Sequence, residues 1–429
     1  MKKANLFLVA ALAAAGLVGV TAGALMPTAA IAAEAAKPKL SASVMKPLKA
    51  AQDAIAQKNF DEALVQLQQA RAVEPQTPYD TFMIDEFTWN VLLQKKDYAG
   101  AVTALEAAVN SGFVAPADLP QRLKALTQIN YQMLKDYPKA IEFGNRYLQA
   151  APNDADVGSM VAASYYQLKD YAAARSAAQK VVASSAKASE AMLQVIMFSS
   201  ASLNDRPGTM QALEQLVRNY QKPKYWEDLL TNQLYETKGD RELRNLYRLM
   251  YQTSTLDKSE EYSEMASVLI AGGFPAEAAK ILELGMNAKV FTGDALAREK
   301  SDLDRARAGA AADSKDLPGA AKSLAAAKTG NEMVAIGKLY FSAADYTNAA
   351  DAVQKGLAKG GVTDIDDANA LLGVALVRAG RPADARAPLQ AVKDPKYAAI
   401  AKLWVLYIDS TAAAATEPAA AAPATPPAG

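Results

Sequence analysis

The sequence of 429 residues contains no cysteine and no histidine. Without these residues the chain lacks the parts of Cys and Ser–His nucleophile systems, of thiolate or imidazole metal sites, of haem attachment and of disulfide bonds. The absence of cysteine also excludes a lipid-modified N-terminal Cys of the kind that anchors bacterial lipoproteins. Catalysis by carboxylate, lysine or tyrosine side chains is left open.

The chain also has no excess of charge of either sign. It contains 46 Lys and Arg and 46 Asp and Glu, so its formal net charge is zero. A balanced charge gives no global attraction to nucleic acid or to an anionic membrane. Hydrophobic residues make up 51% of the chain, enough for a large core, and their bias toward alanine suits closely packed helices. The phosphate-binding and nucleophile-elbow glycine motifs are missing as well.

The N-terminus has the pattern of a targeting segment. Lys2 and Lys3 precede an apolar stretch over residues 6–20, and Ala30-Ile31-Ala32 provides the small residues of a cleavage site. This pattern predicts a signal peptide over residues 1–32. The length of the apolar stretch also leaves an uncleaved membrane anchor open, although its glycines weaken a spanning helix. Export without cysteines favours a bacterial periplasm.

A short phrase recurs along the chain: a basic residue, Asn or Asp, an aromatic residue and, three positions later, alanine. Its clear copies are Lys58–Ala63, Lys96–Ala101, Lys135–Ala140 and Lys169–Ala174. Weaker copies, aligned on the third position, follow at Arg206, Asp240, Pro275, Tyr346 and Pro382. Their spacing is 34 to 39 residues, except for one gap of 71 residues that holds a tenth copy, out of step, at 315–320. A fixed period of this size indicates a repeat architecture.

This period and the helix–turn–helix pattern resemble the tetratricopeptide repeat. That family places L-G-x-x-Y on the first helix and a small residue at the start of the second, and Ile336–Tyr340 and Leu372-Gly373 fit the first of these patterns. Thr209 and Leu243 occupy the small-residue position of two degenerate copies. The resemblance implies an all-α fold, a right-handed α-solenoid (tetratricopeptide superhelix) of about ten helix-turn-helix hairpins.

The C-terminal sequence predicts a capping helix followed by a tail. Asp394-Pro395 suits a helix start, and apolar residues at helical spacing from Ile400 to Tyr407 predict an amphipathic C-terminal capping helix. The Ala/Pro-rich sequence beyond it predicts a disordered segment. The expected organisation is a signal peptide over 1–32, a linker over 33–42, the superhelix over 43–409 and the tail over 410–429.

Two acidic groups are the strongest candidates for chemistry, and neither has the pattern of a site. Asp364, Asp366 and Asp367 lack the glycine and distant Glu of a calcium loop. Glu260 and Glu261 open another expected helix. Acidic residues at helix starts are normally caps and dipole partners. We therefore expect no catalytic, cofactor-binding or metal-binding residues, and no cofactor.

Aromatic residues are concentrated between Tyr220 and Tyr262. They fit either packing between repeats or an amphipathic patch in a groove. The geometry of the family implies that certain first-helix positions face the concave surface. Carried over in register, these groove candidates are Asn90, Tyr166, Gln194, Phe198, Tyr225, Asn232, Tyr235 and Phe341, together with Gln52 and Lys338. This lining of amides and aromatics suits an extended peptide. It differs from the Lys/Asn/Arg clamp with which some chaperone-binding members hold a carboxylate.

The function that these patterns favour is an exported, non-catalytic scaffold that binds envelope proteins or peptides in its concave groove. Binding of envelope glycan or lipid by the groove aromatics is the alternative, and an enzyme is the third hypothesis. The chain also resembles periplasmic repeat proteins encoded beside Ton energy-transduction components, as in Thr77-Pro78-Tyr79, Trp89-Asn90, Tyr225-Trp226 and Lys359-Gly360-Gly361. That resemblance implies a partner among inner-membrane energisers or outer-membrane transporters.

Overall fold

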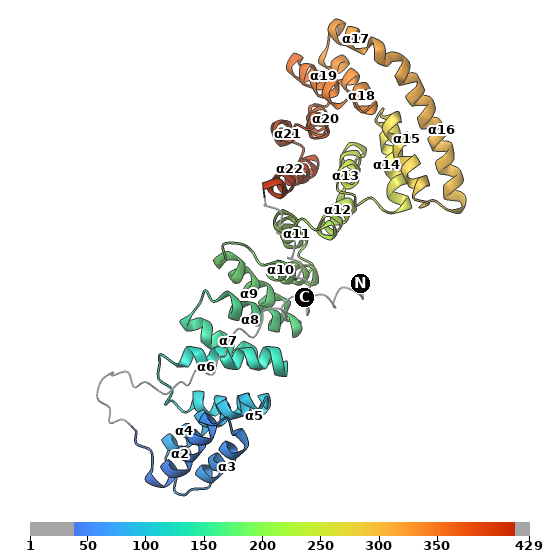
Figure 1. Ribbon diagram of the computed structural model, residues 1–429. Coiled ribbons are helices and arrows are strands. Elements are labelled where there is room, and N and C mark those ends of the chain that lie inside the picture. The colour runs from blue at the N-terminus through green and yellow to red at the C-terminus, as the bar shows by residue number, and fades with distance from the viewer. Residues whose placement is uncertain (1–37, 417–429) are drawn as a thin grey trace, which may run out of the picture. The chain divides into compact units, whose positions relative to one another are not determined.

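The structure, a computed structural model, describes the backbone of residues 38–416 and the side chains of residues 38–412. Every regular element among these residues is a helix, which confirms the predicted all-α solenoid class (Figure 1). The chain divides into two compact units, one ending at Ala212 and the other starting at Leu213. The predicted signal peptide and residues 417–429 lie outside the described residues.

In unit 1 consecutive helices pack as hairpins. The pairs are α2 (Ala42–Ala56) with α3 (Phe60–Arg71), α4 (Pro78–Gln94) with α5 (Tyr98–Asn110), α6 (Leu119–Gln128) with α7 (Tyr137–Ala150), and α8 (Ala155–Gln167) with α9 (Tyr171–Ser184). A π-helical turn, η2 (Ile129–Leu134), prolongs α6, and α10 (Glu190–Ser202) packs on α9. Helix α11 (Arg206–Tyr220) crosses the border between the units.

The repeated phrase forms the turn inside each of these hairpins. Its basic residue has a left-handed φ between 55° and 62° in the four clear copies. The Asn or Asp that follows is the N-cap of the second helix, and its side chain accepts the backbone N–H three residues later at 3.0 to 3.3 Å. The alanine of each clear copy is 0% exposed. The phrase therefore reverses the chain and lets the two helices approach closely.

In unit 2 the same kind of pairing continues. The pairs are α12 (Pro223–Glu236) with α13 (Asp240–Gln252), α14 (Ser259–Ala271) with α15 (Pro275–Asn287), α18 (Gly330–Ser342) with α19 (Tyr346–Lys359), and α20 (Ile365–Arg378) with α21 (Pro382–Gln390). The glycines of the L-G pattern lie at the crossings: a Cβ on Gly337 would lie 2.4 Å from Val353, and one on Gly373 would lie 2.5 Å from Leu389. Helix pairing thus depends on glycine as well as on alanine.

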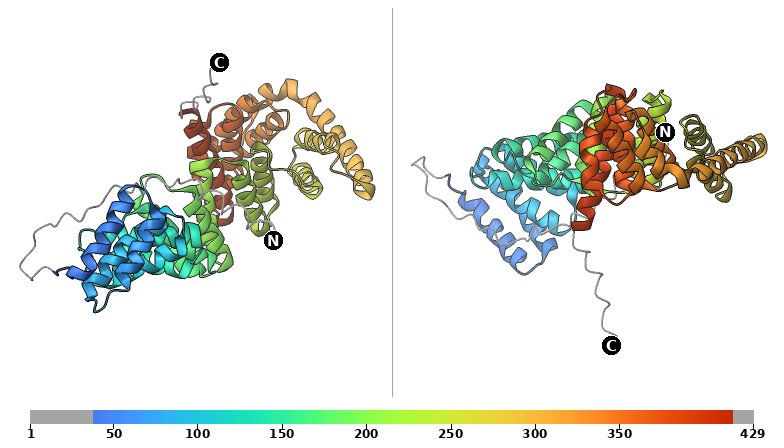
Figure 2. Two further views of the ribbon diagram at one scale, coloured as in Figure 1. Left: turned by 60° about the horizontal axis from the view of Figure 1, so that its bottom comes forward. Right: turned by 90° about the horizontal axis from the view of Figure 1, so that it is seen from above.

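The tenth copy of the phrase, at 315–320, does not make a hairpin. Helix α16 (Gly293–Asp316) runs into a 3-10 turn, η3 (Leu317–Gly319), and then into the short helix α17 (Ala320–Ala326). No residue between Gly293 and Ala344 has a positive φ, so the left-handed turn that reverses the chain in the four clear copies is missing. Figures 1 and 2 show α16 alongside α15, while α17 packs on α18.

The last helix, α22 (Pro395–Thr416), begins where the sequence predicts. Asp394 caps it by accepting the backbone N–H groups of Lys396 and Tyr397 at 3.1 Å. It packs against α13, α20 and α21, and its end at Thr416 lies beyond Asp409, where we expected the superhelix to stop. Within residues 38–416 no helix has both the length and the apolar character that a membrane crossing requires.

Candidate functional site

The groove candidates of unit 1 are half-buried. Asn90 lies on α4 and Tyr166 on α8, the first helices of their hairpins, and Gln194 and Phe198 lie on α10. The ring of Tyr166 packs edge-on against Tyr171 with a centroid distance of 5.7 Å. Burial raises the pKa of Tyr166, which keeps its hydroxyl protonated at neutral pH. Gln194 and Phe198 share one helix, whereas Asn90 and Tyr166 come from other hairpins of unit 1.

The groove candidates of unit 2 differ sharply in exposure. Tyr225 is 5% exposed and Phe341 is 1% exposed, so both belong to the packed interior and cannot line an open groove. Asn232 is half-buried and donates its side-chain N–H to the carbonyl oxygen of Asp228 at 2.8 Å. Tyr235 is 72% exposed. Only Asn232 and Tyr235 therefore remain accessible among the four.

Phe341 on α18 is buried in part by an arginine side chain from helix α13. Arg248 of α13 is 0% exposed, and its guanidinium lies 4.2 Å from the ring centroid of Phe274 and 4.4 Å from that of Phe341. Arg248 and Arg378 each contact Glu277 at 2.7 Å. Burial would raise the pKa of Glu277, but the two guanidinium groups lower it to about 2.

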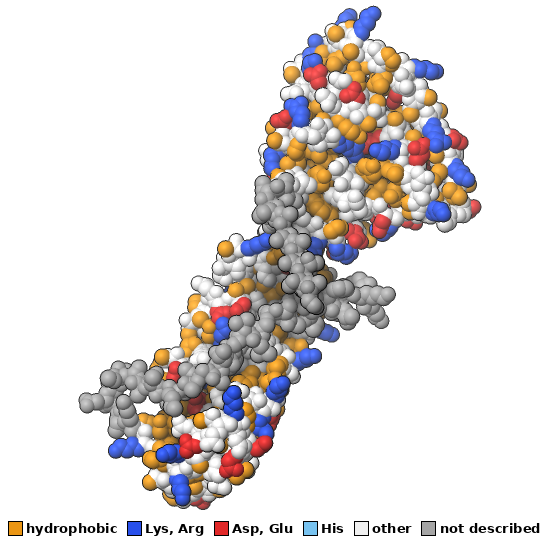
Figure 3. All heavy atoms as spheres, in the orientation of Figure 1, with side chains coloured by type: hydrophobic (Ala, Val, Ile, Leu, Met, Phe, Trp, Pro, Cys, Tyr) orange, Lys and Arg blue, Asp and Glu red, His pale blue; other side chains and the backbone are white. Residues whose placement is uncertain are grey.

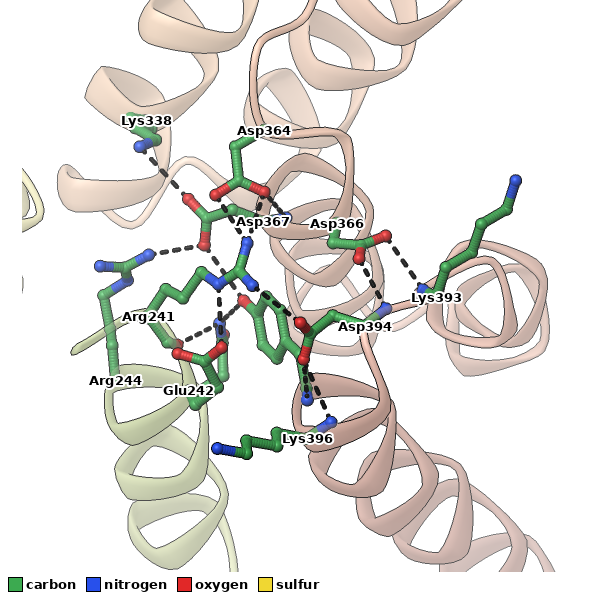
Figure 4. Close-up of polar contacts among 12 residues, drawn as sticks. Arg241, Glu242, Arg244, Lys338, Asp364, Asp366, Asp367, Lys393, Asp394 and Lys396 are labelled. Atoms are coloured by element: carbon green, nitrogen blue, oxygen red, sulfur yellow. Dashed lines mark hydrogen bonds and ion pairs between the residues drawn. The ribbon is translucent and has the colours of Figure 1, made fainter. Parts of the chain in front are cut away.

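A second set of polar contacts ties α13 to α20 and α22 (Figure 4). Arg241 Nη1 donates to both carboxylate oxygens of Asp364 at 2.9 Å, across 123 residues of sequence. Arg244 donates to Asp367 at 2.6 Å, and Tyr397 donates to the same Asp367 oxygen at 3.0 Å. We call this set, with Arg248 and Glu277, the α13 clasp. It occupies the side of unit 2 where the sequence placed a groove.

The three aspartates weighed in the sequence serve structural roles. Asp364 caps α20 by accepting the backbone N–H of Asp367 at 2.9 Å. Asp366 accepts the backbone N–H groups of Lys393 and Asp394 at 3.0 and 2.8 Å. The described residues contain no group of three acidic side chains arranged to hold a metal ion. Every carboxylate of the clasp faces arginine, lysine, tyrosine or backbone N–H donors, an arrangement that stabilises charge rather than one that activates a nucleophile.

An open cavity of about 510 Å³ lies between α12, α13 and α14. We call it the Tyr235 cavity. Its apolar lining comes from Leu234, Tyr235, Leu243 and Tyr247. Its polar lining consists of Thr231, Thr237, Lys238, Lys258, Glu260, Glu261 and Glu264. A volume of this size lies within the range of small-ligand and peptide side-chain pockets.

Two hydrogen-bonded groups fix the polar wall of this cavity. The hydroxyl of Tyr247 donates to Glu264 at 2.6 Å, and burial together with Glu264 raises the pKa of Tyr247 far above its ordinary value. Glu261 accepts the backbone N–H of Asp257 at 3.2 Å and the ammonium of Lys258 at 2.7 Å. Glu261 is therefore a helix cap, as expected, whereas Glu264 presents a carboxylate that a neutral tyrosine holds in place.

The sequence reasoning missed Glu264 and the arginines of α13. Glu264 lies one turn after Glu260 on α14, a spacing that places both on one helix face. Arg244 and Arg248 are likewise four residues apart, on a face of α13 that also carries Arg241 and Asn245, and the apolar residues on the rest of the helix gave no sign that this polar face is buried as well. On the face of unit 2 that Figure 3 shows, basic and acidic side chains are mixed. No patch of one charge on this face marks a binding site.

No protein-family model matches the sequence, and the search of curated proteins found no match. Solved structures with a similar fold include MamA from Desulfovibrio magneticus RS-1, with 17% identity, 43% of this chain and 96% of that chain covered, and a TM-score of 0.30. A tetratricopeptide repeat protein from Parabacteroides merdae ATCC 43184 has 13% identity to this chain and a TM-score of 0.28. The match covers 78% of this chain and 100% of that chain. PilF of Pseudomonas aeruginosa has 17% identity and a TM-score of 0.26, and the match covers 43% of this chain and 96% of that chain. None of these three names refers to Ton energy transduction.

Proposed function

We propose that this protein is a non-catalytic scaffold that binds a protein or peptide partner at the Tyr235 cavity. The observation that carries the proposal is an open cavity of about 510 Å³ beside a tyrosine that is 72% exposed. An exposed aromatic ring next to a preformed hollow is a common anchor of protein interfaces, because it buries a large area with few rotatable bonds.

The architecture of the chain supports this proposal. A stack of helical hairpins presents a continuous surface without needing a buried active site. The cavity is built by three consecutive helices of one unit, so a partner would meet a rigid surface and little rearrangement would be needed. The clasp buries Phe341, which leaves Asn232 and Tyr235 of α12 as accessible groove candidates, and Tyr235 lines the cavity.

We also propose that the chain acts in the bacterial envelope. The motivation is the signal-peptide pattern over residues 1–32, which predicts cleavage after Ala32 and export to the periplasm. The partner would then be an envelope protein, and the resemblance to repeat proteins of Ton gene clusters motivates a search among inner-membrane energisers and outer-membrane transporters. Intact-mass measurement of the protein from a periplasmic fraction tests export. A mass that retains residues 1–32 would contradict it.

The binding proposal is tested by crosslinking in the native cell followed by capture of the chain and mass spectrometry. We expect a specific envelope protein to be recovered with the wild type and to be lost with Tyr235→Ala. The matched control is Ile365→Ala, because Ile365 is also a large apolar residue, is 56% exposed and lies outside the cavity. Equal recovery with Tyr235→Ala and the wild type would contradict the proposal. Tyr235-dependent retention of glycan or lipid alone would favour the alternative.

A further inference from the structure

We infer that the Tyr235 cavity accepts a basic side chain, Arg or Lys, from an extended segment of the partner. This inference rests on the proposed function, and it names the chemistry of the ligand. It starts from how the cavity is built: Tyr235 comes from α12, Leu243 and Tyr247 come from α13, and Glu260 and Glu264 come from α14.

The charges of the lining favour a cation. Five charged residues line the cavity: Lys238, Lys258, Glu260, Glu261 and Glu264. Lys258 and Glu261 are paired at 2.7 Å, and Glu261 is buried, so this pair neutralises itself. Of the remaining charged residues, Glu260 and Glu264 are negative and Lys238 is positive, which leaves the lining with one net negative charge. An anionic ligand would meet two carboxylates, whereas a cationic one would be attracted.

Glu264 is the carboxylate best placed to receive that cation. The hydroxyl of Tyr247 donates to Glu264 Oε2 at 2.6 Å and holds the carboxylate in one orientation. A carboxylate has about four acceptor positions, so this single hydrogen bond leaves capacity for a guanidinium or ammonium donor. Tyr247 is 0% exposed, and its raised pKa keeps it a donor over the whole neutral range. The orientation of Glu264 is therefore set before the ligand arrives.

Tyr235 supplies the second contact that a basic side chain uses. Its ring is 72% exposed and carries the negative face of an aromatic quadrupole, which attracts a guanidinium or ammonium group. The alkyl stem of Lys or Arg packs on apolar surface while its head stays polar, and Leu234 and Leu243 give the cavity that surface. The volume of about 510 Å³ holds one such side chain and parts of its neighbours, which suits an extended segment.

The test uses the full chain as it is purified from cells and a matched set of synthetic peptides. Each is a nine-residue, acetylated and amidated peptide with leucines flanking the central position, which carries Arg, Lys, citrulline or Glu. Citrulline matches Arg in shape but is neutral. We expect the Arg and Lys peptides to bind at least about 10-fold more tightly than the citrulline peptide in fluorescence polarisation, in line with one charge-assisted hydrogen bond. We expect the Glu peptide not to bind.

Variants of Glu264 and Tyr235 test whether these residues cause the preference for a basic side chain. Glu264→Gln keeps the shape of the side chain and should reduce the Arg-over-citrulline preference to the roughly 2- to 5-fold that the cation–π contact with Tyr235 supplies. Tyr235→Ala should weaken the Arg peptide roughly 2- to 5-fold through loss of the cation–π contact. The matched control is Asp351→Asn, an isosteric loss of a half-exposed carboxylate on α19, which should change nothing. Circular dichroism verifies that each variant is folded.

The outcomes separate this inference from the proposed function. Equal binding of the Arg and citrulline peptides would overturn the inference, and a loss with Tyr235→Ala would then still support a peptide-binding cavity. If no peptide binds while Tyr235→Ala still abolishes capture of the envelope partner, the inference is wrong and the proposed function stands. If Tyr235→Ala changes neither peptide binding nor capture, the proposed function is wrong as well.

Discussion

At the scale of single residues, the lysine of the repeated phrase adopts a backbone conformation that disfavours any residue with a Cβ. Lys96 is exposed and has φ of 61°. A left-handed residue other than glycine costs about 1–2 kcal/mol, whereas glycine avoids this cost but loses more entropy on folding. We therefore expect Lys96→Gly to leave the free energy of unfolding unchanged or to raise it by up to about 1 kcal/mol.

Lys96→Val provides the contrast, because a β-branched side chain tolerates positive φ worst. We expect it to lower the free energy of unfolding by about 1–2 kcal/mol relative to the glycine variant. Urea unfolding followed by circular dichroism measures both. A valine variant as stable as the glycine variant would show that the turn relaxes to another conformation.

Glu277 should make stability depend on pH. Burial opposes its charge, yet Arg248 and Arg378 lower its pKa to about 2, below the ordinary value of 4.5. A lowered folded-state pKa stabilises the fold above the unfolded pKa, and this contribution is lost as the pH falls through the folded pKa. We expect Glu277→Gln to cost roughly 3–5 kcal/mol at pH 7, because it leaves two buried guanidinium groups without a counter-charge.

The difference between the wild type and Glu277→Gln should shrink as the pH falls from about 4.5 toward 2. Denaturant unfolding at several pH values measures it. Glu283→Gln is the control, because Glu283 pairs with Arg307 at the surface, and its loss should change stability by less than about 1 kcal/mol. A difference that stays constant over this pH range would mean that Glu277 is not the titrating group.

Some of these residue roles can be predicted from the sequence and others cannot. Asn and Asp favour N-cap positions, so Asn59 and Asp97 could be placed in turns. The left-handed lysine before them could not be, because lysine has no preference for that conformation. Its φ is imposed by the two helices that the turn joins.

At the scale of helices, glycine sets how closely the two members of a hairpin approach. A Cβ on Gly337 would lie 2.4 Å from Val353 Cγ2 and 3.3 Å from the carbonyl oxygen of Ala349. Gly337→Ala should therefore separate α18 from α19 and lower the free energy of unfolding by about 1–3 kcal/mol, despite the better helix propensity of alanine. Thermal unfolding of the variant and the wild type measures the loss.

Removing the neighbour should restore part of that stability. In Gly337→Ala/Val353→Ala the new methyl group gains room, so the two changes should couple favourably in a double-mutant cycle. Gly319→Ala is the control: its φ is −88° and a Cβ there would meet no atom within 4 Å, so it should be neutral or stabilising. Strictly additive effects at Gly337 and Val353 would contradict contact between them.

The helices follow the sequence wherever the turn signal is complete. The copies with Asn or Asp before a helix start gave hairpins, and the degenerate copy at Arg206 kept its cap through Asp205, which accepts the N–H of Gly208 at 3.0 Å. At 315–320 the Lys-Asp pair is present, but Asp316 remains helical with φ of −85° and ψ of −23°. Helix α16, which runs up to this point, packs on α15, so the Lys-Asp pair alone is not enough to make a turn.

At the scale of the whole molecule, the sequence repeat predicted the stacking of hairpins. It did not predict that the clasp would bury groove positions of unit 2. The register placed Lys338 and Phe341 on inward-facing positions, and the structure has them in contact with Asp367 and with Arg248. The clasp joins segments 123 residues apart, and no local pattern encodes such a pairing. The expectation of an open groove lined by Phe341 was therefore wrong, whereas Tyr235 stays a candidate.

The clasp should hold α13 against α20 and α22, an arrangement that we call the closure of unit 2. The pair of Arg244 and Asp367 tests this role. Their side chains are 6% and 11% exposed, so removing one partner leaves a buried charge. Arg244→Met should lower the free energy of unfolding by about 3 kcal/mol, the low end for a buried pair, because Lys338 and Tyr397 still contact Asp367. Arg244→Met/Asp367→Asn should recover at least about 1 kcal/mol of that loss.

Trp404 reports on the closure directly, since its indole N–H donates to the carbonyl oxygen of Asn245 on α13 at 3.1 Å. We expect its fluorescence, measured with Trp89 and Trp226 replaced by Phe, to shift to the red in Arg244→Met and to return toward the starting value in the double variant. An unchanged emission maximum together with a large loss of stability would show that α13 and α22 stay joined without the Arg244–Asp367 pair, through their other contacts, such as that of Gln252 with Tyr407.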